Sequence, residues 1–273
     1  MITFPNAKIN LGLNIVSRRP DGYHNIETVF YPIPLTDSLE IVPAEGSEST
    51  LTCYGRVVDC PTEKNLVMKA YRMMEKEFGL PPVDIYLVKH IPDGAGLGGG
   101  SSDASFCMKM LNDMFKLGCT AEQLAKMASK IGADCPFFIH NKPMMATGIG
   151  DEFTPTDVCL KGKHMLLVKP DVSVPTKAAY AQVTPAPSAK PIPEILSDGM
   201  ENWQKELVND FEKSVFAQYP SLAEIKRTLL NSGATYAAMS GSGSSIFGIF
   251  SCAEMAEKAA DHFKEYSHFV IQL

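Results

Sequence analysis

The sequence predicts an α+β protein with two domains. Its 273 residues, 45% of them hydrophobic and 21% charged, can bury one large core or two moderate ones. Short apolar runs separated by turn residues fill the first 42 positions and predict antiparallel strands. Apolar residues at helical spacing follow in several later regions. A boundary is expected at about residues 157–163, which divides the chain into domains 1–158 and 159–273.

The predicted elements follow from these patterns in chain order. The expected strands are Ala7–Ile15, Thr28–Pro34, Ser38–Val42, Asp84–Ile91, Pro143–Phe153 and His164–Lys169. The expected helices are Asn65–Phe78, Asp103–Leu117, one that opens on the capping box Thr120–Gln123 and stops at Gly132, and one that opens on the capping box Ser221–Glu224 and stops at Gly233. Four prolines between Pro185 and Pro193 predict an extended surface connection, and a final strand, hairpin and helix are expected within Ala234–His262.

The most informative stretch is the glycine-rich run Pro92–Ser102, which lies between a predicted strand and a predicted helix. Backbone without bulky side chains can turn several amides toward an anion, and the N-terminus of the next helix adds further amides and the positive end of its dipole. The ordered flanks argue against a flexible linker.

Other phosphate-binding folds fit this run less well. Gly94, Gly96 and Gly99 satisfy the dinucleotide fingerprint, but that fold needs an acid at the end of a second strand about 20 residues later, where a helix is predicted. The run also lacks the Gly-Lys-Ser/Thr ending of a Walker loop. We therefore expect a phosphate-binding loop of another kind.

Composition excludes several classes of protein. The net charge of −6 argues against a general nucleic-acid or membrane-surface binder. No signal peptide or membrane span is visible, so a cytoplasmic protein is expected. The seven cysteines are scattered and never spaced C-x-x-C, which predicts neither a zinc site nor a disulfide framework. Cys135 is not expected to be a nucleophile.

Three motifs in fixed order resemble the GHMP superfamily of small-molecule kinases. They are Pro5–Gly12, Pro92–Ala104 and Ser240–Phe247. Within that superfamily, Arg19–His24, the triple glycine Gly98–Gly100 and Ile131–Pro136 are similar to the branch that acts on a cytidine diphosphate conjugate of methylerythritol. The resemblance covers nearly the whole chain.

The resemblance implies a fold and a reaction. The implied fold has an N-terminal ribosomal-protein-S5-like nucleotide domain and a C-terminal ferredoxin-like αβ domain. The implied reaction transfers the γ-phosphoryl group of ATP to the 2-hydroxyl of the methylerythritol conjugate, in the non-mevalonate route to isoprenoid precursors. Mg²⁺ is the expected cofactor, with no protein ligand assigned. The expected partner is this small molecule, with no nucleic acid and no membrane, and the chain is expected to be a monomer or a weak homodimer.

The same resemblance implies the nucleotide and catalytic residues. Those expected at ATP are Asn65, near the adenine, and Pro92, Asp93, Gly94, Ala95, Gly96, Leu97, Gly98, Gly99, Gly100, Ser101 and Ser102. Asp134 is the expected general base, or a group that positions the acceptor, and the Lys8 ammonium would orient it and stabilise the emerging alkoxide. From the residues alone, two other roles stay open and are favoured: Asp134 as a helix-terminal turn residue and Lys8 as a solvated strand residue.

A further set is implied at the substrate. It comprises Asn10, Tyr23, His24, Tyr180, Gly241 and Ser242. Tyr23 and Tyr180 would stack on the two faces of the pyrimidine, and His24 would read its edge. Gly241 and Ser242 predict either a second anion-binding loop or a plain hairpin turn.

Three other functions remain open. A kinase for mevalonate, homoserine or a sugar is disfavoured by the pair Tyr23–His24 and the triple glycine. A nucleotide-binding protein without catalysis is disfavoured by Lys8 and Asp134. An oxidoreductase with a dinucleotide cofactor is disfavoured by the missing acid-ended strand.

Overall fold

The computed structural model describes residues 1–57, 60–181 and 183–273. The chain forms two compact units, each built from separate stretches of sequence. The first unit comprises Met1–Ala7, Leu35–Asp93 and Gly98–Lys142, and the second comprises Lys8–Pro34, Gly94–Leu97 and Pro143–Leu273. Because neither unit is one continuous stretch, the boundary between residues 158 and 159 stays a prediction about sequence domains. The glycine-rich run contributes to both units.

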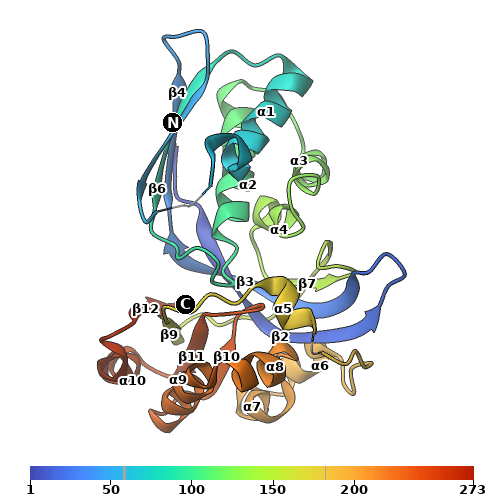
Figure 1. Ribbon diagram of the computed structural model, residues 1–273, viewed down its shortest axis with the longest axis vertical. Helices are drawn as coiled ribbons and strands as arrows, with labels where there is room; N and C mark the ends of the chain where they lie inside the picture. Colours follow the sequence, from blue (N-terminus) through green and yellow to red (C-terminus); the bar gives the residue numbers. More distant parts are fainter. Residues whose placement is uncertain (58–59, 182) are drawn as a thin grey trace. The chain divides into compact units, whose positions relative to one another are not determined.

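The first unit packs helices on one four-stranded sheet (Figure 1). The sheet order is β1 (Ile2–Thr3), β4 (Ser38–Pro43), β6 (Val83–Lys89) and β5 (Thr50–Gly55), antiparallel except for the parallel pair β5–β6. The helices are α1 (Leu66–Phe78), α2 (Gly99–Met114), α3 (Ala121–Ala128) and α4 (Cys135–His140), with a 3-10 turn η1 at Thr62–Lys64. The β6 residues Val83, Ile85 and Leu87 are buried.

Local signals explain where the helices of the first unit begin and end. The Asn65 side chain accepts a hydrogen bond from the amide of Val67 at 2.9 Å and caps α1, and Gly79 ends that helix with a left-handed φ of 66°. The predicted helix Asn65–Phe78 is thus confirmed. The capping box at Thr120 is also confirmed, although α3 stops at Ala128 rather than at Gly132.

The start of the second helix was predicted four residues too late. Gly98 takes a left-handed φ of 71°, and the helix α2 begins at the next residue. The two remaining glycines of the triple thus form its first turn, although glycine is a poor helix former. The helical glycines bring the N-terminus of α2 directly to the loop.

The second unit contains two further four-stranded sheets. One has the order β2 (Asn6–Arg18), β3 (His24–Thr36), β7 (Met144–Thr147) and β8 (Glu152–Pro155). The first residues of β2 and the last residues of β3 belong to the first unit. The other is antiparallel, with the order β10 (Tyr236–Met239), β11 (Ile246–Phe250), β9 (His164–Lys169) and β12 (Ser267–Gln272). The helical elements are α5 (Thr176–Ala181), α6 (Ile192–Ser197), η2 (Met200–Asn202), α7 (Trp203–Glu206), α8 (Phe211–Gln218), α9 (Pro220–Asn231), α10 (Ala253–Ala260) and η3 (Asp261–Phe263).

Several expectations for the second unit were wrong in detail. The predicted single strand Pro143–Phe153 is the hairpin β7–β8, because Gly148 and Gly150 turn the chain with positive φ values. The capping box at Ser221 does not form, since Pro220 occupies the first helical position and places Ser221 inside α9. The strand β12 was not predicted.

The mixture of sheets and helices confirms the predicted α+β class. Ser38–Val42 also proves to pair in a different sheet from the two long strands before it. Among the helices that the structure describes, none combines the length and the apolar composition needed to cross a bilayer.

Candidate active site

The N-terminus of α2 is open to an anion. No side chain caps it, and its first turn contains no acidic residue. A 16-residue helix with unpaired first amides presents partial positive charge at this end. The flanking part of the glycine-rich run therefore has the polarity expected of a phosphate site.

The middle of the glycine-rich run is Gly94–Leu97, and the carbonyl groups of Ala95, Gly96 and Leu97 accept hydrogen bonds from the protein. The carbonyl of Leu97 accepts the Lys8 amide at 2.9 Å. The carbonyl of Gly96 accepts both the Lys8 ammonium at 3.0 Å and the Ser240 hydroxyl at 2.9 Å. Within the described part of the chain, the amides of Gly94–Leu97 donate no hydrogen bond to the protein. Ala95 and Leu97 are buried, whereas Gly94 is exposed and Gly96 half-buried, so the amides of the two glycines are the ones that this loop offers to an anion.

Lys8 is held in a defined position. It is only 4% exposed, so its interpretation as a solvated strand residue is wrong. Its ammonium donates to Asn10 Oδ1 at 2.7 Å and lies 4.6 Å from the centre of the Phe30 ring. The Asn10 amide in turn donates to Thr28 Oγ1 at 2.9 Å. Two predicted residues, Lys8 and Asn10, are therefore joined directly to each other, and Lys8 is also joined to the glycine loop.

Asp134 lies in the first unit, directly before α4. It is half-buried, and its side chain does not cap that helix, although the residue occupies the capping position. The adjacent Cys135 is buried, and burial raises the pKa of its thiol to about 11, so the thiol stays protonated at neutral pH. The roles predicted for Asp134 stay predictions.

The predicted pyrimidine site brings together His24 and Tyr180. Their rings are stacked with centroids 4.9 Å apart and an interplanar angle of 16°. The Phe211 ring packs edge-on against the Tyr180 ring, with the two ring centroids 4.7 Å apart, and so orients Tyr180. Tyr23 is 61% exposed and is not a core residue. The ring that faces Tyr180 is thus His24 rather than Tyr23, and binding of a pyrimidine here stays a prediction.

Gly241 and Ser242 lie in the turn of the β10–β11 hairpin. Asn209 donates to the carbonyl of Gly241 at 2.8 Å, and the hydroxyls of Ser242 and Thr176 lie 3.2 Å apart. Whether this turn also binds substrate stays a prediction.

A cavity of about 190 Å³ in the first unit collects several predicted nucleotide residues. Asn65, Asp93 and Gly100 line it together with Cys60, Lys64, Leu66, Leu87, Lys89 and Asp103. The remaining members of the run, Pro92, Gly98, Gly99, Ser101 and Ser102, lie at either flank of the loop in the same unit. The cavity and the open helix end thus belong to one part of the fold.

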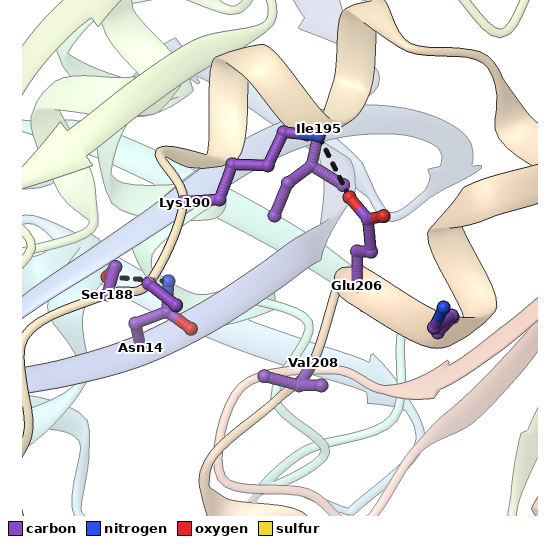
Figure 2. A pocket seen from close by; sticks show the side chains of 8 residues that line it. Asn14, Ser188, Lys190, Ile195, Glu206 and Val208 are labelled. Atoms are coloured by element: carbon purple, nitrogen blue, oxygen red, sulfur yellow. Dashed lines mark hydrogen bonds and ion pairs between the residues drawn. The ribbon is translucent and has the colours of Figure 1, made fainter.

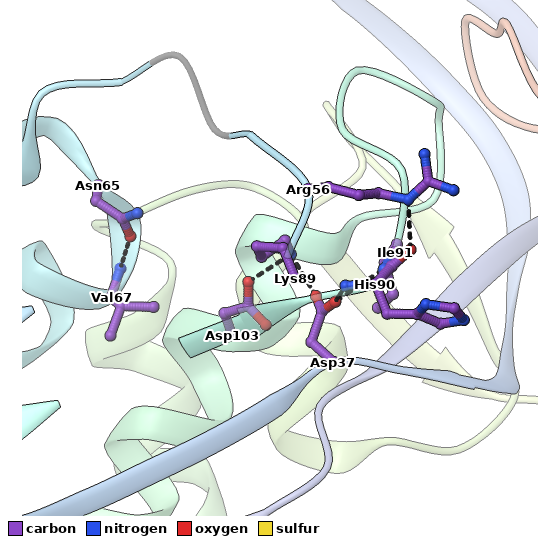
Figure 3. A network of polar contacts seen from close by, with 8 residues as sticks. All are labelled: Asp37, Arg56, Asn65, Val67, Lys89, His90, Ile91 and Asp103. Carbon is purple, nitrogen blue, oxygen red and sulfur yellow. Dashed lines mark hydrogen bonds and ion pairs between the residues drawn. The ribbon is translucent and has the colours of Figure 1, made fainter. Parts of the chain in front are cut away.

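Sequence reasoning missed a buried charge cluster beside this cavity, formed by Asp37, Lys89 and Asp103 (Figure 3). The Lys89 ammonium forms a close ion pair with Asp37 and another with Asp103 at 2.7 Å. Burial raises the pKa of Asp103 to about 7. The charge of Lys89 acts to lower this pKa, and the charge of Asp37 acts to raise it. Burial alone would lower the pKa of Lys89, but the two carboxylates raise it.

The sequence did carry a signal for this cluster. Lys89 continues the period-2 series of inward residues Val83, Ile85 and Leu87 on β6. A lysine at an inward strand position needs a buried partner of opposite charge.

A second cavity, of about 400 Å³, lies in the second unit (Figure 2). Lys190 beside it pairs with Asp198 and, at 2.9 Å, with Glu206. Asn14 donates to the hydroxyl of Ser188 at 2.9 Å. Because these polar groups satisfy one another, we assign no ligand to this cavity.

Comparison with known proteins agrees with this geometry. The family model of the GHMP kinases N terminal domain matches residues 65–142, and that of the GHMP kinases C terminal domain matches residues 189–268. The 4-diphosphocytidyl-2-C-methyl-D-erythritol kinase of Bacteroides fragilis is 56% identical over 260 residues, which cover 94% of this chain and 95% of the relative. That of Parabacteroides distasonis is 54% identical over 269 residues, covering 98% and 96% of the two chains.

Solved structures give the same assignment. A 4-(cytidine 5'-diphospho)-2C-methyl-D-erythritol kinase matches with a TM-score of 0.85 and 31% identity, covering 99% of this chain and 98% of the other. The mevalonate kinase of Methanococcus jannaschii shares the fold, with a TM-score of 0.75 at 15% identity and coverage of 100% and 98%. The chain therefore belongs to the GHMP kinases and, within them, to the 4-diphosphocytidyl-2-C-methyl-D-erythritol kinase family.

Proposed function

We propose that the chain transfers the γ-phosphoryl group of ATP to the 2-hydroxyl of 4-diphosphocytidyl-2-C-methyl-D-erythritol. The observation that carries this function is the glycine-rich run, whose central carbonyls are used internally while its amides and the start of α2 are available to an anion. The relatives that share more than half of the sequence bear the name of this kinase. ATP is the donor in GHMP kinases, and the chain is an enzyme of this family.

Phosphoryl transfer depends mainly on positioning and on neutralising charge. Backbone amides of Gly94 and Gly96 and the first turn of α2 would bind the phosphate oxygens of ATP. The hydrogen bonds that the Gly96 and Leu97 carbonyls accept would hold this part of the run before ATP arrives. Asn65 and the cavity beside it would receive the adenine.

We assign the proton and charge chemistry to Asp134 and Lys8. The Asp134 carboxylate would take the proton of the 2-hydroxyl as that oxygen attacks the γ-phosphorus and ADP leaves. The Lys8 ammonium would stabilise the negative charge that develops on the attacking oxygen and the moving phosphoryl group. Burial of Lys8 supports this role, because a charge acts more strongly where water is excluded.

We propose Mg²⁺ as the cofactor, bound largely by phosphate oxygens of ATP. No cluster of three or more His, Cys, Asp or Glu side chains suited to a metal occurs in residues 1–57, 60–181 and 183–273. The Ser102 hydroxyl is buried and has no hydrogen-bond partner within the described protein, so Ser102 fits a bound phosphate with its metal, and Ser101 would be its neighbour in that role. The ion would neutralise charge on the triphosphate.

The cytidine end of the substrate would bind at Tyr180, His24 and Tyr23. Phe211 already orients Tyr180, and the exposed ring of Tyr23 is available for stacking. His24 would leave the face of Tyr180 and hydrogen-bond the edge of the base. Asn10 and the turn at Gly241 would contact the remainder of the substrate. We further propose a cytoplasmic protein, a monomer or weak homodimer, that binds neither nucleic acid nor membranes.

The deciding experiment measures ADP release by the purified protein with ATP and Mg²⁺. The acceptors are 4-diphosphocytidyl-2-C-methyl-D-erythritol, mevalonate, homoserine and galactose. We expect turnover with the cytidine conjugate alone. Turnover with another acceptor, or none with the conjugate in protein that binds ATP, would contradict the proposal. Asp134→Asn serves as the impaired variant, and the exposed Asp151→Asn serves as its matched control.

A further inference from the structure

The charge cluster of Asp37, Lys89 and Asp103 is almost completely buried. The three residues are 0%, 6% and 1% exposed. Removing three charges from water is costly, and apolar residues of similar volume often serve stability as well. When both carboxyl groups are ionised, two carboxylates around one ammonium leave the cluster with an excess of negative charge. Because Lys89 and Asp103 line the cavity of the proposed nucleotide site, the effect of the cluster on the position of the neighbouring backbone bears on that site.

Asp37 holds the chain where it enters the glycine-rich run. Its Oδ1 accepts the amides of His90 at 2.5 Å and Ile91 at 2.8 Å, the two residues between the end of β6 and Pro92 (Figure 3). These amides lie beyond the last ladder position of β6, so the carboxylate replaces the partner that a neighbouring strand would supply. Asp37 thereby sets the direction in which the chain leaves the sheet.

Lys89 connects the chain segment that precedes the glycine-rich run to α2, the helix that follows it. Its ammonium binds Asp37 and also Asp103, which lies in the second turn of α2. The two flanks approach closely, because a Cβ built on Gly99 would lie 3.0 Å from Ile91 Cγ2 and 3.3 Å from Lys89 Nζ. One ammonium therefore links the strand that enters the run and the helix that leaves it.

We propose that Asp37 is a positioning residue for the nucleotide phosphates, acting through Lys89 and Asp103 on both flanks of the glycine-rich run. The inference rests on the proposed function of that run. With its flanks linked, the run presents its amides in one arrangement, and ATP does not have to order them on binding. Asp37 itself is not among the described residues that line the cavity, so its effect on a ligand is indirect.

Two variants separate positioning from plain stability. Asp37→Ala removes the acceptor for both amides and the partner of Lys89. Asp37→Asn keeps one oxygen for the amides but presents an NH₂ group to the Lys89 ammonium, so it removes the Asp37–Lys89 ion pair and leaves the Lys89–Asp103 pair in place. The matched control is Asp210→Ala, since Asp210 Oδ2 likewise accepts a backbone amide, that of Ile15 at 2.7 Å, in the second unit.

The measurement is the dissociation constant for ATP and for adenosine, by calorimetry, at a temperature where each variant is folded. Adenosine shares the base and the ribose with ATP but has no phosphate for the run. We expect Asp37→Ala to weaken ATP binding by about tenfold or more and Asp37→Asn by a smaller factor, with adenosine binding weakened by a clearly smaller factor than ATP binding in each variant, since Lys89 and Asp103 also line the cavity. Asp210→Ala should leave both constants within about twofold.

Each result bears on the inference. Equal weakening of ATP and adenosine, or unchanged ATP binding in the Asp37 variants, would overturn it while leaving the proposed function in place. Failure of the unaltered chain to bind ATP would instead overturn the proposed function, and this inference with it. If Asp37→Ala does not fold, Asp37→Asn carries the same test with the same outcomes.

Discussion

Replacing Gly96 by alanine tests how the glycine-rich run is held in the second unit. Gly96 has a φ of +74°, and a Cβ built there would lie 2.0 Å from the carbonyl oxygen of Ser240, whereas real Cβ atoms stay beyond about 3.0 Å from other atoms. The obstacle is backbone, so the two chain segments must separate by about 1 Å. A left-handed φ costs a non-glycine residue about 1 kcal/mol in addition.

The separation would break the hydrogen bonds that the Gly96 carbonyl accepts from the Ser240 hydroxyl at 2.9 Å and the Lys8 ammonium at 3.0 Å. A neutral hydrogen bond contributes about 1 kcal/mol and a charged one about 2 kcal/mol. We therefore expect Gly96→Ala to lower the free energy of unfolding by about 4 kcal/mol. Gly94→Ala is the matched control, because Gly94 has a φ of +57° with nothing within 4 Å of the added Cβ. It should cost about 1 kcal/mol.

The assay is urea denaturation of the two variants beside the unaltered chain, followed by titration with ATP. A difference of about 3 kcal/mol between the variants, with weaker ATP binding in Gly96→Ala, is the expected result. Equal losses of stability in the two variants would refute the reasoning, because the contact with Ser240 would then not restrain the run.

The remaining predictions concern the proposed catalytic and substrate residues. Lys8→Ala and Asp134→Asn should each lower kcat by about 100-fold or more with little change in ATP affinity, and a parallel loss of ATP binding would contradict their roles. Tyr180→Ala should raise the KM for the cytidine substrate about fivefold, while Tyr180→Phe keeps the stack; equal KM values for both would remove the ring from the site. Burial raises the folded pKa of Asp103 to about 7, so the folded state holds more protons than the unfolded state between about pH 4 and 7, and stability falls as pH rises through that range. Asp103→Asn should flatten this dependence in urea midpoints measured from pH 5 to 8; an unchanged slope would show that another group causes it.

Helices with strong local signals were predictable from the sequence. The cap of α1 joins Asn65 to Val67, and the capping box of α3 joins Thr120 to Gln123, so each signal acts between residues two or three positions apart. The capping box expected at Ser221 failed because Pro220 starts the helix earlier. The resemblance also supplied the family, which the comparisons confirm.

The sequence by itself determined the composition of the glycine-rich run, the helices with local caps and the family motifs. Only the tertiary structure decided that Lys8 is buried against the run, that Gly96 meets Ser240 across 144 positions, and that Lys89 binds Asp37 across 52. Hydrogen bonds between near neighbours depend on a few local dihedral angles, whereas these contacts depend on how strands and helices pack. Packing sets which distant polar groups share a buried space, and burial then requires that they be paired.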